Sequence, residues 1–117
     1  MSKPATSVFV FGIYMALNGF ALLIIPNSIL NLFDFPTTNE IWIRVVGMLM
    51  LILAYYYIFT ALKEITSFFY LSIPARFAGI IFFTAFVLFG LASPKIISFG
   101  VLDLLSGIWT TIALKKS

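Results

Sequence analysis

Polar and charged residues divide the chain into four long apolar runs. The runs cover residues 7–25, 41–62, 73–92 and 94–114. An α-helix rises about 1.5 Å per residue, so about 20 residues cross the roughly 30 Å hydrocarbon core of a bilayer. A helix also pairs its backbone polar groups within one segment, as lipid requires. The pattern predicts four transmembrane helices.

Helix-breaking and capping residues lie between the runs. Pro26 follows the first run, and residues 37–40 (TTNE) have the form of a capping box before the second. Ser72 before Pro74 and Ser93 before Pro94 mark the starts of the third and fourth. We therefore expect the last two helices to form a tight hairpin joined by one or two residues. The whole chain, residues 1–117, is predicted to be one domain: an all-α integral membrane four-helix bundle with antiparallel up-down topology.

The first connection, residues 26–39, is the longest. It carries five large apolar side chains, Ile29, Leu30, Leu32, Phe33 and Phe35. Two interpretations stay open: a short segment lying in the membrane interface, or a packed surface loop.

Composition agrees with a bilayer as the solvent. Hydrophobic residues make up 62% of the chain and charged residues 9%, against about 25% charged in soluble domains. There is no Cys and no His, which removes disulfide, haem and the usual zinc chemistry. The four carboxylates show no metal-ligand spacing, so we expect no cofactor. General acid–base catalysis would rest on Asp103 alone, which makes an enzyme the least supported class.

Charge placement suggests membrane anchoring rather than nucleic-acid binding. The net charge is +3, and most basic residues lie near segment ends. Orientation follows from the side with more Lys and Arg. One predicted side holds Lys3, Lys63, Arg76, Lys115 and Lys116, and the other holds Arg44 and Lys95. This bias predicts that both termini are cytoplasmic.

Asp103 is the one acid within an apolar run. It lies about 13 Å into the fourth predicted helix, where a charge costs about 2.5–3.5 kcal/mol on insertion scales. It should therefore face protein and have a partner. Its helical face also carries small and polar residues, which are typical of helix–helix contacts in lipid: Gly100, Ser106, Gly107 and Thr110.

Two arginines could pair with Asp103. Arg44 enters the membrane from the same predicted side, at a depth that differs by about 8 Å, so we predict an Arg44–Asp103 ion pair. Arg76 is expected to face the same interior nearer the cytoplasm. Three roles stay open for this group: a ligand site, a structural ion pair, or a contact between subunits.

Other polar side chains complete the candidate site. Asn18 lies midway along the first helix, with Phe11 and Tyr14 near its face, and could bond another helix or a ligand. Of the run Tyr55-Tyr56-Tyr57, at most two side chains can face the interior. We interpret Tyr56 and Tyr57 as part of an aromatic belt at the membrane interface. The candidate ligand-binding residues are Arg44, Arg76, Asp103, Asn18, Tyr55 and Thr110.

Two short motifs, Arg44-Val-Val-Gly47 and Arg76-Phe-Ala-Gly79, give the chain a family resemblance. With four helices and a short first loop, it resembles small bacterial inner-membrane proteins of the DoxX-like kind. The resemblance implies a bacterial plasma membrane.

Three functions follow from these features. The first is a membrane protein that binds an amphiphilic or anionic small molecule, or a lipid, between its helices, with an arginine at the head and aromatic side chains along the tail. The second is an accessory or structural subunit of a membrane complex. The third is a transporter or channel built as a homo-oligomer.

Overall fold

The computed structural model describes residues 1–116, which fold into helices and turns and contain no strand. The helices are α1 (Lys3–Ile24), α2 (Pro26–Leu32), α3 (Trp42–Leu62), α4 (Thr66–Leu88), the 3-10 helix η1 (Pro94–Ile96) and α5 (Ile97–Lys116).

Four of these helical segments are long and apolar enough to cross a membrane: α1, α3, α4, and η1 continued by α5. Each has 21 to 23 residues, which corresponds to a length of about 30–35 Å for an α-helix. The predicted all-α membrane protein with four spanning helices is confirmed at this level.

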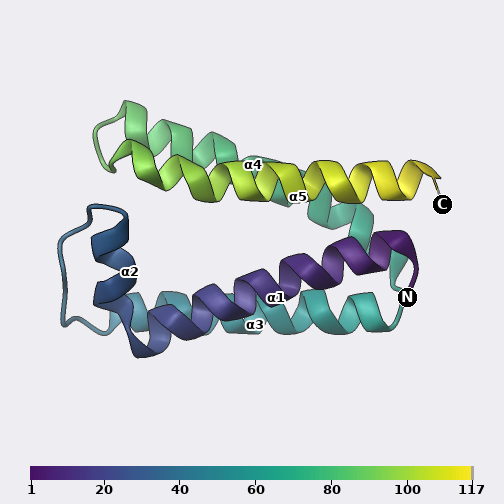
Figure 1. Ribbon diagram of the computed structural model, residues 1–117, viewed down its shortest axis with the longest axis horizontal. Coiled ribbons are helices and arrows are strands. Elements are labelled where there is room, and N and C mark those ends of the chain that lie inside the picture. The colour runs from purple at the N-terminus through teal and green to yellow at the C-terminus, as the bar shows by residue number, and fades with distance from the viewer. Residues whose placement is uncertain (117) are drawn as a thin grey trace.

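The helices form two closely packed pairs (Figure 1). α1 lies along α3, and α4 lies along α5. The pairs touch each other mainly through α1 and α5. The short helix α2 stands at one end of the molecule, and both termini lie at the other.

The contact between α1 and α3 depends on two glycines. A methyl group at Gly19 would come 2.8 Å from the carbonyl oxygen of Gly47, and one at Gly47 would come 2.6 Å from that of Gly19. The two backbones therefore touch directly, as small residues permit in apolar helix pairs. Farther toward the termini the interface becomes a buried core that includes Val8, Phe11 and Tyr57.

The small-residue face predicted for the last helix packs as expected. Gly100 lies against Ile80 and Phe83 of α4, and Gly107 lies against the ring of Phe77. Because these glycines leave room for large side chains, α5 packs closely on α4.

The predicted boundaries of the third span, 73–92, are wrong at both ends. α4 begins at Thr66 and runs through Pro74. Proline is tolerated inside membrane helices because the carbonyl that it leaves unpaired can be satisfied by neighbouring groups. The helix ends at Leu88, where Gly90 adopts a positive φ of 74°. The Leu91 amide then donates to the Phe86 carbonyl at 2.8 Å, closing a Schellman turn. The hairpin is therefore longer than the predicted one or two residues.

The predicted capping box at residues 37–40 does not form. The residue that precedes α3 is Ile41, which supplies no side-chain cap. The Thr38 hydroxyl instead accepts from the Glu40 amide at 3.0 Å, and the Thr38 amide donates to the Asn27 side chain at 2.9 Å. The part of the first connection that follows α2 thus folds back onto α2.

Candidate ligand-binding cavity

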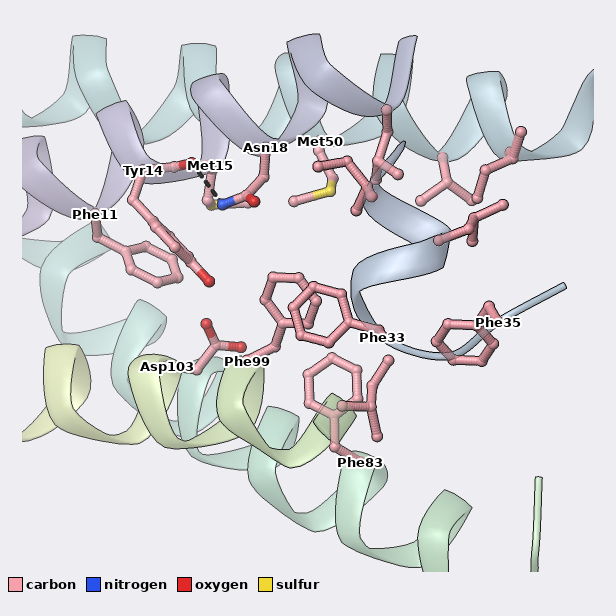
Figure 2. A pocket seen from close by; sticks show the side chains of 16 residues that line it. Phe11, Tyr14, Met15, Asn18, Phe33, Phe35, Met50, Phe83, Phe99 and Asp103 are labelled. Atoms are coloured by element: carbon pink, nitrogen blue, oxygen red, sulfur yellow. Dashed lines mark hydrogen bonds between the residues drawn. The ribbon is translucent and has the colours of Figure 1, made fainter. Parts of the chain in front are cut away.

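A cavity of about 280 Å³ lies between the two helix pairs, near α2 (Figure 2). Side chains from all four spanning segments and from α2 line it. The lining residues are Phe11, Tyr14, Met15, Asn18, Leu22, Ile29, Leu30, Phe33, Phe35, Ile43, Val46, Met50, Phe83, Ile96, Phe99 and Asp103. Because nearly all of these side chains are apolar, the cavity suits an apolar molecule.

Aromatic rings close the end of the cavity that lies near α2. The rings of Phe33 and Phe99 stack with centroids 4.3 Å apart, and Phe83 lies 6.3 Å from Phe99. The Phe33 carbonyl accepts a hydrogen bond of 2.9 Å from Ser93 in the turn before η1. The segment after α2 is therefore fastened to the α4–α5 hairpin and covers the cavity.

An exposed ion pair adds to this closure. Lys95 Nζ lies 3.4 Å from Asp34 Oδ2. An exposed pair of this kind contributes at most about 1 kcal/mol. The stacked rings and the Ser93 hydrogen bond therefore hold the segment after α2 together with this ion pair.

Three polar side chains also face the cavity, Tyr14 and Asn18 from α1 and Asp103 from α5. The carboxylate of Asp103 and the hydroxyl of Tyr14 point toward each other from α5 and α1 (Figure 2). Asn18, one turn after Tyr14, donates its side-chain N–H to the Tyr14 carbonyl at 2.9 Å. The predicted interior positions of Asp103 and Asn18 are consistent with this arrangement.

Within residues 1–116, two of these groups have no partner. The buried Tyr14 hydroxyl makes no hydrogen bond, and the Asp103 carboxylate makes neither a hydrogen bond nor an ion pair. Unpaired polar groups next to apolar walls are costly. They are therefore the points at which a bound molecule could be recognised.

The predicted Arg44–Asp103 ion pair is wrong. Arg44 is exposed, and its Nη1 donates to the carbonyl of Leu23. Leu23 lies in the last turn of α1, whose carbonyls have no partner within their own helix. A cation at this place is favoured by the helix dipole, so Arg44 caps α1 instead of meeting Asp103.

Tyr55 does not line the cavity either. It is 58% exposed on the outer face of α3, where it contacts Tyr56 and Phe59. The member of the tyrosine run that faces inward is Tyr57, which is buried against Phe11. The interfacial position predicted for Tyr57 is therefore wrong.

Arg76 and Thr110 form a separate buried cluster with two serines. Arg76 Nη2 donates to the hydroxyls of Thr110 and Ser72, both at 2.9 Å. The Ser7 hydroxyl lies 2.7 Å from the carbonyl of Pro4 and 2.7 Å from the Thr110 hydroxyl. A carbonyl can only accept and a hydroxyl has one proton. Ser7 therefore donates to Pro4, and Thr110 donates to Ser7.

This cluster joins the two helix pairs at the half of the molecule that is nearer the termini. The guanidinium of Arg76 lies 5.0 Å from the centre of the Phe11 ring, a cation–π distance. Phe11 also lines the cavity, whereas Arg76 and Thr110 do not. Neither residue is therefore at the cavity surface, although both belong to the predicted candidate site. The parts that Ser7 and Ser72 play were not predicted, because serine is common in apolar helices.

Metal binding has no support among the described residues, since no three His, Cys, Asp or Glu side chains come together there. No known protein family, curated protein sequence or solved structure matches the chain. The resemblance to DoxX-like proteins therefore stays a prediction.

Proposed function

We propose that this small membrane protein binds an amphiphilic molecule or a lipid chain in the cavity between its two helix pairs. The observation that carries the proposal is the cavity itself, which has apolar walls and a polar group of Asp103, Tyr14 and Asn18 on one side. A concave apolar site with a few converging polar groups is the usual form of a small-molecule site.

The cavity volume limits the size of the bound part. The cavity of about 280 Å³ lies just below the roughly 300–1,000 Å³ that is common for sites of drug-sized ligands. This size corresponds to one short alkyl chain, or to the end of a longer chain that leaves the protein for the bilayer.

The orientation is part of the same proposal. The chain crosses a bacterial plasma membrane as an antiparallel up-down four-helix bundle with both termini in the cytoplasm. Four lysines support it, because Lys3, Lys63, Lys115 and Lys116 lie at or near helix ends on the side of the termini. Arg76 does not indicate the orientation, since it lies in the interior of α4 and not near a helix end.

A cavity-filling variant tests the proposal. Leu22→Trp places a large ring in the cavity, while Leu17→Trp adds the same ring at a position on α1 that is 68% exposed. Binding of radiolabelled octan-1-ol is measured in nanodiscs, with empty nanodiscs as background. We expect saturable binding to the wild type and to Leu17→Trp, and none to Leu22→Trp. Equal binding by all three proteins would contradict the proposal.

The outer face of α4 favours a second candidate, a subunit of a larger membrane assembly. α4 buries only Phe69, Ser72 and Arg76. Its exposed residues include Leu71 and Phe82. Chemical cross-linking in native membranes would support this candidate if a discrete product forms through α4, and would contradict it if only monomer is recovered.

A further inference from the structure

We infer that the molecule bound in the cavity has a protonated amine as its polar end, recognised by Asp103 with Tyr14 and Asn18. This inference rests on the proposed function and specifies its ligand.

The first argument is the unpaired carboxylate. Among residues 1–116, no side chain donates to Asp103. A carboxylate between apolar helices needs a donor or a counter-charge. Arg76 attracts this carboxylate only from a distance and makes no ion pair with it. Within the same residues, its Nη2 donates to Ser72 and Thr110, and its Nη1 has no hydrogen-bond partner. A direct partner for the Asp103 carboxylate is therefore left for a ligand to supply.

The second argument is the hydrogen-bonding capacity of the neighbouring groups. One of the two Asn18 side-chain N–H groups donates to the Tyr14 carbonyl at 2.9 Å, and the side-chain oxygen remains an acceptor. The Tyr14 hydroxyl is unpaired and can also accept. An ammonium group has three donors and no acceptor. The three N–H donors of an ammonium group therefore match three acceptors, one each on Asp103, Tyr14 and Asn18. Its positive charge is opposite to that of the Asp103 carboxylate.

The third argument excludes an anionic head. A carboxylate or phosphate would face the charge of Asp103 across the cavity. Neither arginine lines the cavity to pair with such a head, because Arg44 donates to Leu23 and Arg76 donates to Ser72 and Thr110. The rest of the lining is apolar and includes the stacked rings of Phe33 and Phe99, which leaves the remaining space to the apolar part of the amine.

Three probes with the same chain and different heads test the inference: octylamine, octan-1-ol and octanoate. Binding of each is measured in nanodiscs of zwitterionic lipid near neutral pH, with empty nanodiscs subtracted to remove partitioning. A charge-assisted hydrogen bond adds enough affinity for about a tenfold preference or more. We expect octylamine to bind at least about tenfold more tightly than octan-1-ol, and octanoate to bind most weakly.

Variants then assign the preference to its residues. Asp103→Asn keeps the shape of the side chain and removes its charge, so the amine should lose its advantage while octan-1-ol still binds. Asp34→Asn, which neutralises an exposed acid outside the cavity, should leave the preference unchanged. Tyr14→Phe removes one acceptor and should weaken the binding of octylamine about two- to tenfold.

The outcomes separate the two proposals. If octan-1-ol binds but octylamine binds no more tightly, the amine inference is wrong and the cavity function stands. If none of the probes binds the wild type, the proposed function fails as well. The comparison of heads on the wild type decides the inference even if Asp103→Asn does not fold.

Discussion

The carboxylate of Asp103 rests on the backbone of Gly79. A methyl group at Gly79 would lie only 2.6 Å from Asp103 Oδ2. Because Gly79 has no side chain, the carboxylate can lie against the α4 backbone beside the cavity. The second Arg-x-x-Gly motif of the sequence supplies this glycine, together with Arg76 one turn earlier.

Replacing Gly79 by alanine should change ligand recognition more than stability. The atom that an added methyl meets is the far end of a flexible side chain, so the carboxylate can turn away. We expect Gly79→Ala to melt within a few degrees of the wild type and to lose the preference for octylamine over octan-1-ol. A variant that keeps the full preference would show that the position of the carboxylate does not depend on Gly79.

The crossing of α1 and α3 should tolerate no side chain at Gly19. The added methyl would meet the Gly47 carbonyl oxygen at 2.8 Å, and a backbone atom cannot move aside. Overpacking of this kind costs about 1–3 kcal/mol, of which the better helix propensity of alanine offsets about 1 kcal/mol. Thermal unfolding in detergent should show a lower melting temperature for Gly19→Ala.

Gly12→Ala is the matched control on the same helix. Its nearest neighbour is a side-chain atom, Ile58 Cγ1 at 2.9 Å, and its nearest backbone atom, the Ile58 amide nitrogen, lies at 3.2 Å, against 2.8 Å for the Gly47 carbonyl oxygen at Gly19. We expect a smaller loss of stability than for Gly19→Ala. The reverse order would contradict the account of the α1–α3 contact.

The buried hydroxyl of Thr110 should be important for stability. Thr110→Val keeps the shape but leaves Arg76 Nη2 and the Ser7 hydroxyl each without one partner. Loss of a buried partner costs about 1–3 kcal/mol. Thr111→Val is the control, because Thr111 bonds only the Gly107 carbonyl of its own helix at 2.8 Å. Similar melting temperatures for the two variants would show that the cluster does not hold the helix pairs together.

Glu64 lies at the end of the molecule that carries the termini. It should make the stability of the fold depend on pH. The hydroxyl and the amide of Ser2 donate to this carboxylate at 3.1 to 3.3 Å. These hydrogen bonds lower the pKa of Glu64 below its usual value of 4.5. Because the pKa of Glu64 is lower in the folded state, its contribution to the free energy of unfolding is complete above pH 4.5. That contribution is lost as pH falls through the pKa of the folded state.

Melting temperatures in acid should therefore fall less steeply for Glu64→Gln than for the wild type. The comparison is made from neutral pH down to about pH 3, below the usual range of glutamate pKa values. Parallel curves for the two proteins would show that the contact between Ser2 and Glu64 does not stabilise the fold.

The number of spans was predictable because a bilayer requires continuous apolar runs of a set length. The ends of α4 were not, since they depend on particular residues. Pro74 looked like a helix start but lies inside the helix. Gly90 ends the helix by its positive φ, although the apolar run continues past it.

The site was predictable in part. Depth along a helix placed Asp103 and Asn18 in the interior, and both line the cavity. Depth does not give the rotation of a helix about its axis, and that rotation decides which arginine faces inward. The contact of Gly47 with α1 turns Arg44, one helical turn earlier, toward Leu23. The cavity itself depends on where α2 packs, which residue patterns do not specify.

A native mass spectrum of the protein released from mild detergent tests the central claim most directly. The claim is that a molecule occupies the cavity between the helix pairs. We expect the wild type and Leu17→Trp to carry a discrete additional mass, and Leu22→Trp to appear without it. A wild type without any added mass, or the same added mass on Leu22→Trp, would contradict the claim.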